Sequence, residues 1–88
     1  MKSYKFIISG KVQGVYYRVS VKNNALKSNY KGYVKNLTDG TVEAGVTCKE
    51  SHIHDFIEIL KQGSKSSNVT NIEQSEHNEV FNNTFEVR

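Results

Sequence analysis

The amino-acid sequence predicts an α+β fold, with two helices packed on one face of an antiparallel sheet of four to five strands. Several segments alternate apolar and polar residues, which is the period of a strand, and one segment repeats apolar residues with the period of a helix. An Asp39-Gly40 dipeptide separates two of the alternating segments, as in a β-hairpin. The 88 residues are expected to form a single domain, residues 1–88.

The first strand is predicted over residues 4–9, because Tyr4, Phe6 and Ile8 fall on one face of an extended chain. A loop over residues 10–17 follows. Residues 18–29 are the first helix candidate, although they include several weak helix formers. This helix is expected to carry apolar residues on one side, with others nearby: Val19 and Leu26 on that side, and Val21 and Ala25 beside them.

A hairpin is predicted next, with strands over residues 31–37 and 41–49 on either side of the Asp39-Gly40 turn. Its second strand places a run of small apolar residues on one face: Val42, Ala44, Val46 and Cys48. We interpret Cys48 as a small core residue rather than a nucleophile, because no histidine neighbours it in the sequence.

The second helix is predicted from its apolar residues at positions i, i+3, i+4 and i+7, which are Ile53, Phe56, Ile57 and Leu60. Ser51 is its candidate N-cap, and Gly63 lies just past its end.

A fourth strand is predicted over residues 68–76, a polar turn over 77–83 and a last short strand over 84–87. The order strand, helix, strand, strand, helix, strand is that of the ferredoxin-like βαββαβ sandwich. Right-handed crossovers place both helices of such a fold on the same side of the sheet.

The composition sets limits on partners and location. The chain has 12 Lys and Arg against 9 Asp and Glu, a net charge of +3, which suits an anionic ligand and equally a solvated basic surface. No block of five like charges is present, so no nucleic-acid-binding tail is expected. With one cysteine, no signal sequence and no apolar span, we expect a cytoplasmic protein without a membrane partner.

The loop over residues 10–18 is the first candidate site. Gly10 and Gly14 permit backbone angles that turn successive N–H groups toward one point, and Arg18 adds a planar fork of donors in the first helical turn. Such a combination binds a small anion. A tight strand–helix connection with a solvated arginine is the alternative, and the residues alone leave it open.

Asn36 is the second candidate, because asparagine is depleted in strands and an amide can position a water molecule. The alternative is that Asn36 has only a structural role, leading the chain from the strand into the turn. The histidines His52, His54 and His77 are poorly spaced for metal ligands, so we expect surface histidines and no metal site.

Two stretches of the chain resemble the signatures of the acylphosphatase family. Residues 10–18, GKVQGVYYR, match G-x-V-Q-G-V-x-[FY]-R. Residues 32–43, GYVKNLTDGTVE, match G-[FYW]-[AVC]-[KRQ]-N-x-x-[DE]-G-x-V-[ED]. The two signatures occur in order and at the right separation, and the resemblance extends over essentially the whole chain.

The resemblance implies hydrolysis of small acyl phosphates. Their carboxylate is a good leaving group, so the reaction is expected to need no metal and no cofactor. We also expect a monomer, because the linear pattern shows no exposed apolar patch. The resemblance also implies that Arg18 binds the phosphate and that Asn36 orients the attacking water. The phosphate cradle is then the loop from Gln13 to Tyr17, whose members are Gln13, Gly14, Val15, Tyr16 and Tyr17.

Three features depart from the family pattern. Tyr17 stands where phenylalanine is usual, so a buried ring would carry a hydroxyl that needs a partner. Gly63-Ser64 stands where relatives usually have Gly-Pro, and residues 76–84 are unusually polar.

Two other function classes fit the same fold. RNA-recognition motifs share the element order, and Lys31-Gly32-Tyr33-Val34 is similar to the start of their aromatic strand motif. The similarity stops at Lys35 and Asn36, where further aromatic residues would be needed. A catalytically silent binding module is the other class, disfavoured because both Arg18 and Asn36 are present.

Overall fold

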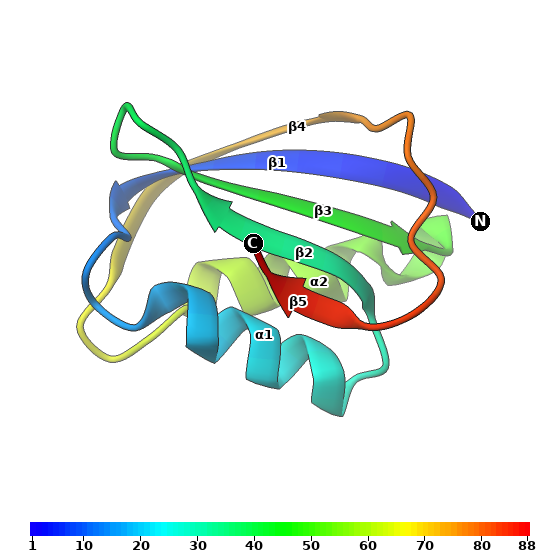
Figure 1. Cartoon of the computed structure of the whole chain (residues 1–88), viewed down its shortest axis with the longest axis horizontal. Helices are drawn as coiled ribbons and strands as arrows, with labels where there is room; N and C mark the ends of the chain where they lie inside the picture. The colour runs from blue at the N-terminus through cyan, green and yellow to red at the C-terminus, as the bar shows by residue number, and fades with distance from the viewer.

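A computed structural model describes all 88 residues, as a five-stranded sheet with two helices on one of its faces (Figure 1). The strands and helices, with a short 3₁₀ turn η1 before the second helix, are β1 (Lys2–Lys11), α1 (Tyr17–Lys27), β2 (Lys31–Asn36), β3 (Val42–Cys48), η1 (Glu50–His52), α2 (Ile53–Gln62), β4 (Asn68–Glu76) and β5 (Phe85–Val87). The predicted ferredoxin-like α+β architecture is confirmed.

The sheet has the strand order β4-β1-β3-β2-β5 and is mixed, not antiparallel as expected. The first four strands pair antiparallel, but β5 pairs parallel to β2, with Gly32 opposite Phe85. The reason is that β4 finishes at the same end of the sheet at which β2 starts, although the two strands are not neighbours (Figure 1). The chain then crosses to the far side and runs back in the direction of β2.

The core lies between the sheet and the helices. The predicted inward face of β1 is confirmed, because Tyr4, Phe6 and Ile8 are all buried. The predicted inward face of β3 is buried as well, including the free thiol of Cys48. At the centre of the core, three rings have their centroids within 6 Å of the Phe56 ring: Phe6 at 5.5 Å, Tyr30 at 5.1 Å and Phe85 at 5.9 Å.

The buried face of α1 differs from the prediction. Val19 and Leu26 are 46% and 42% exposed, whereas Val21 and Ala25 are fully buried, together with Tyr17. The helix begins one residue earlier than expected, at Tyr17. Residues 17, 21 and 25 then form a stripe with a spacing of four, which lies on one side of a helix.

The hairpin and the second helix follow the prediction with changes at their ends. Leu37 and Thr41 close the hairpin loop through a hydrogen bond between the Leu37 N–H and the Thr41 carbonyl (2.9 Å), so β3 begins at Val42. Ser51 is not the N-cap of α2, because it lies in η1 and the helix begins at Ile53 with no side-chain cap. Gly63 does end the helix, with φ of 51°.

The outer face of the sheet is covered at Tyr33, which is only 1% exposed. The Tyr33 hydroxyl donates to Glu43 and lies 3.0 Å from Nε2 of His77, and the Arg88 guanidinium sits 4.3 Å from the ring centre. His77 is therefore half-buried in a cluster and is not the surface residue expected. Burial and the Glu43 hydrogen bond raise the pKa of Tyr33.

We predict that Val21→Ala lowers the free energy of unfolding by about 1–2 kcal/mol, because it removes two buried methyl groups. Val19→Ala is the matched control on the exposed face of α1. It should change stability by less than about 0.5 kcal/mol, since alanine is the better helix former. Urea denaturation of both variants measures this difference, and equal losses would contradict the buried face described here.

Candidate active site

The loop between β1 and α1 is held by its two ends and shaped by residues with positive φ. Val12 is buried, and Gly10 lies so close to β4 that a Cβ there would come within 2.1 Å of the Asn68 carbonyl oxygen. Gly14 has φ of 71° and Tyr16 has φ of 61°. Left-handed residues in such a turn direct successive N–H groups to one side of the chain.

The N–H groups of this loop are free. None of the backbone N–H groups from Gln13 to Tyr16 donates a hydrogen bond within the protein. The first N–H groups of α1 have no partner in the helix, no side chain caps it, and its first turn holds no acidic residue. Unsatisfied donors at the positive end of a helix dipole form a binding site for a small anion.

Arg18 lies beside these donors, in the first turn of α1. Its half-buried guanidinium forms no ion pair and no side-chain hydrogen bond. Arg18 lines a cavity of about 350 Å³ together with both ends of the loop and the start of the helix, namely Val12, Gly14, Tyr16, Tyr17 and Val19. The structure thus brings an unpaired cation and free amide donors to one place.

Asn36 is the last residue of β2, and its side chain is exposed and makes no hydrogen bond. The β2–β3 loop that follows it lies at the same end of the sheet as the loop after β1 (Figure 1). Three of the sequence-predicted site residues, Gln13, Val15 and Asn36, do not line the cavity beside Arg18. Asn36 therefore lies at the end of the sheet that carries the loop after β1, but outside the cavity beside Arg18.

The Gln13 side chain connects the two loops. Its Nε2 donates to the Leu37 carbonyl and to the Thr41 carbonyl, both at 2.8 Å. These carbonyls belong to the residues that open and close the loop after Asn36. Gln13 thereby fixes the position of the Asn36 end of β2 relative to the loop before α1. The resemblance pointed to Gln13 only as part of the phosphate cradle and missed this connection.

The β2–β3 loop is also braced from within. Oδ1 of Asp39 accepts hydrogen bonds from the Thr41 backbone N–H (3.0 Å) and the Thr41 hydroxyl (2.6 Å). These hydrogen bonds lower the pKa of the Asp39 carboxyl below its ordinary value. The loop is therefore braced by a carboxylate at neutral pH.

The end of α2 supports the loop between β1 and α1 from behind. The buried Tyr17 hydroxyl was expected to need a hydrogen-bond partner, and it donates to the Leu60 carbonyl at 2.7 Å. Burial raises the pKa of this phenol. Gly63 packs so closely on the Tyr17 ring that a Cβ would lie 2.6 Å from a ring carbon. Ser64, where relatives usually carry proline, donates from its hydroxyl to the Val15 carbonyl at 2.6 Å. That departure from the family pattern was the only sequence signal for Ser64.

No group of three or more His, Cys, Asp or Glu side chains is positioned to hold a metal ion. Neither helix has the length and apolar character needed to cross a bilayer.

We predict that Gln13→Met lowers the free energy of unfolding by about 1–2 kcal/mol, because it removes two hydrogen bonds and leaves the Leu37 and Thr41 carbonyls with only their backbone partners within the loop. Gln62→Met is the matched control, since Gln62 is exposed at the end of α2 and forms no side-chain hydrogen bond. Urea denaturation gives the stabilities, and amide hydrogen exchange at residues 37–41 reports the loop directly. Unchanged exchange there in Gln13→Met would contradict the proposed connection.

We predict that Ser64→Ala releases the Val15 carbonyl and costs about 1 kcal/mol of stability. Ser66→Ala is the control, because Ser66 is exposed in the same loop and makes no side-chain hydrogen bond. Greater backbone mobility across residues 14–17 in Ser64→Ala alone is the expected result, measured by ¹⁵N relaxation in NMR.

Comparison with known proteins gives one family. The family model described as Acylphosphatase matches residues 4–87. The chain is 40% identical to the acylphosphatase of Methanocella arvoryzae over 88 residues, which is all of both chains. The crystal structure of acylphosphatase from Bacillus subtilis superposes with a TM-score of 0.90 at 36% identity, covering 100% of this chain and 99% of that one. An acylphosphatase from Coxiella burnetii gives a TM-score of 0.87 at 33% identity, covering 99% and 92% of the two chains. The chain therefore belongs to the acylphosphatase family, and its family and fold support an enzyme that hydrolyses acyl phosphates.

Proposed function

We propose that Arg18 and the backbone N–H groups of residues 13–17 bind the phosphoryl group of a small acyl phosphate, and that Asn36 orients the attacking water. The observation that carries this proposal is the unpaired Arg18 guanidinium beside a loop whose N–H groups have no partner in the protein. The phosphate-binding residues are then Gln13, Gly14, Val15, Tyr16 and Tyr17. Arg18 also binds the phosphate and, with Asn36, is a catalytic residue.

The reaction forms a bond between the water oxygen and phosphorus and breaks the bond between phosphorus and the acyl oxygen. The leaving group is a carboxylate, which is stable as an anion, so the step needs no general acid to protonate it. Phosphoryl transfer passes through a loose transition state with negative charge on the equatorial oxygens. Fixed N–H donors and a guanidinium stabilise that charge without having to reorganise.

Asn36 contributes by orientation, because an amide is not basic enough to take a proton from water. The proton of the attacking water passes late in the reaction, to a phosphoryl oxygen of the substrate itself. The chemistry proposed here is complete without a metal ion or a cofactor, since charge stabilisation comes from Arg18 and the loop amides.

We propose further that residues 1–88 act as a single domain, as a monomer in the cytoplasm, on a small diffusible substrate rather than a nucleic acid. Tyr33 supports the last point. An RNA-recognition surface stacks bases on exposed aromatic rings of its sheet, whereas Tyr33 is covered by Phe81, His77 and Arg88.

We predict that the chain hydrolyses benzoyl phosphate in excess chelator and does not cleave p-nitrophenyl phosphate. Arg18→Ala and Asn36→Ala should each lower the rate by about 10²–10³ or more, the usual cost of one lost transition-state donor. Lys22→Ala is the matched control, a cation one turn further along α1 and outside the cavity.

Circular dichroism confirms folding of each variant. A folded native chain without activity would overturn the proposal, and RNA retention at moderate salt would then be tested. Activity abolished by the chelator would contradict metal independence alone.

A further inference from the structure

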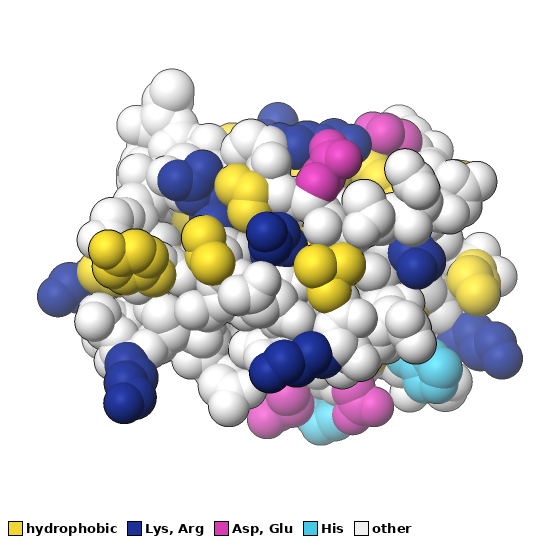
Figure 2. Space-filling view, turned by 60° about the horizontal axis from the view of Figure 1, so that its bottom comes forward, with side chains coloured by type: hydrophobic (Ala, Val, Ile, Leu, Met, Phe, Trp, Pro, Cys, Tyr) yellow, Lys and Arg dark blue, Asp and Glu magenta, His cyan; other side chains and the backbone are white.

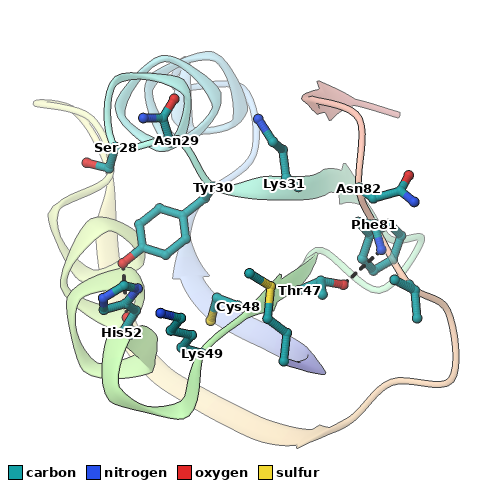
Figure 3. Close-up of a pocket in the computed structure, with 12 residues that line it drawn as sticks. Ser28, Asn29, Tyr30, Lys31, Thr47, Cys48, Lys49, His52, Phe81 and Asn82 are labelled. Carbon is teal, nitrogen blue, oxygen red and sulfur yellow. Dashed lines mark hydrogen bonds between the residues drawn. The ribbon is translucent and has the colours of Figure 1, made fainter.

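A second and larger cavity lies at the opposite end of the sheet from the phosphate loop. It has a volume of about 630 Å³, in the usual range for small-molecule sites. Figure 3 shows its walls, which come from the end of α1 and the start of β2, the end of β3 and η1, and the segment before β5. Ser28, Tyr30, Cys48 and Phe81 mark these walls.

The floor of this cavity is apolar. Tyr30, Cys48 and Phe81 line it and are 7%, 5% and 8% exposed. At the rim, Val80 is 68% exposed and extends the apolar surface outwards. An exposed valine beside three buried apolar side chains offers the body of an apolar ligand a continuous surface.

Two hydroxyl groups of the walls, those of Tyr30 and Thr47, are satisfied within the protein. The Tyr30 hydroxyl donates to the His52 carbonyl at 3.0 Å. The Thr47 hydroxyl oxygen accepts from the Phe81 N–H at 2.8 Å and is hydrogen-bonded to Ser3 at 2.6 Å. These groups therefore require nothing from a ligand.

Two lysine side chains of the walls carry positive charge that has no partner within the protein. Lys31 and Lys49 line the cavity, and neither ammonium group forms an ion pair or a hydrogen bond. None of the twelve lining residues is acidic. Burial and the charge of Asp55 raise the pKa of Tyr30, and Asp55 lines a neighbouring hollow that shares Ser28, Tyr30 and His52 with this cavity. The cavity thus combines an apolar floor with unpaired positive charge.

We propose that this cavity is a binding site for a small organic anion with an aromatic or branched apolar body and one carboxylate-like head group. The body packs on Tyr30, Cys48 and Phe81, and the head group lies between Lys31 and Lys49. The site is separate from the phosphate loop and does not depend on the activity proposed above. The scattered basic side chains seen over the helical layer in Figure 2 add a general attraction for anions.

The test is an NMR titration of the isotope-labelled full chain with 2-naphthoate, compared with the neutral 2-naphthylmethanol. We expect 2-naphthoate to shift the backbone amides of Tyr30, Cys48 and Phe81 and to leave those of residues 13–18 in place. The neutral compound should bind about tenfold more weakly. Absence of shifts at these three residues up to about 5 mM, or shifts confined to residues 13–18, would overturn the proposal.

Charge variants make the test independent of the wild-type result. Lys31→Gln/Lys49→Gln should weaken 2-naphthoate binding about tenfold, whereas the control Lys22→Gln/Lys65→Gln leaves it unchanged. Val80 is exposed, so substitutions there preserve folding. Val80→Glu should weaken binding and Val80→Lys should strengthen it. The proposal is wrong if both double lysine variants bind 2-naphthoate with the same affinity. It is also wrong if Val80→Glu and Val80→Lys change the affinity in the same direction.

Discussion

The Gln13 side chain links two loops that are far apart in the sequence, and the geometry of the site depends on this link. Its amide reaches Leu37 and Thr41, 24 and 28 residues away, at 2.8 Å each. Arg18 follows the first loop and Asn36 precedes the second. Without the Gln13 hydrogen bonds, the sheet would still hold the two strands together, but no side-chain hydrogen bond would join the two loops.

A second set of contacts fixes the loop between β1 and α1 from the other side. Tyr17 and Ser64 tie the loop and the start of α1 to the end of α2, through the Leu60 and Val15 carbonyls. Donors that are already in place when charge develops are more effective than donors that must move. The loop thus owes its rigidity to partners up to 49 residues away and not to its own short sequence.

The sequence predicted most of the fold, because strand alternation and the Asp39-Gly40 hairpin are local signals. The predictions were wrong where contacts between distant segments determine burial or strand pairing. In α1 the valines at 19 and 21 are equally apolar, and only the sheet determines that Val21 is buried. The parallel pairing of β5, the burial of His77 and the contacts of Ser64 all join distant segments. Arg18 and Asn36 were candidate site residues from the sequence pattern and the family signatures, whereas the Gln13 connection needed the structure.

The two outermost strands of the sheet have a consequence for how copies of this chain meet at high concentration. A free strand edge invites pairing with another molecule and aggregation. Here β5 is only three residues long and is followed by Arg88, which is paired with Glu86. On the other side β4 carries Glu73 and Glu76, and an irregularity at Ser9 and Gly10 breaks its register with β1. Short length, charge and a bulge are features that discourage edge-to-edge growth.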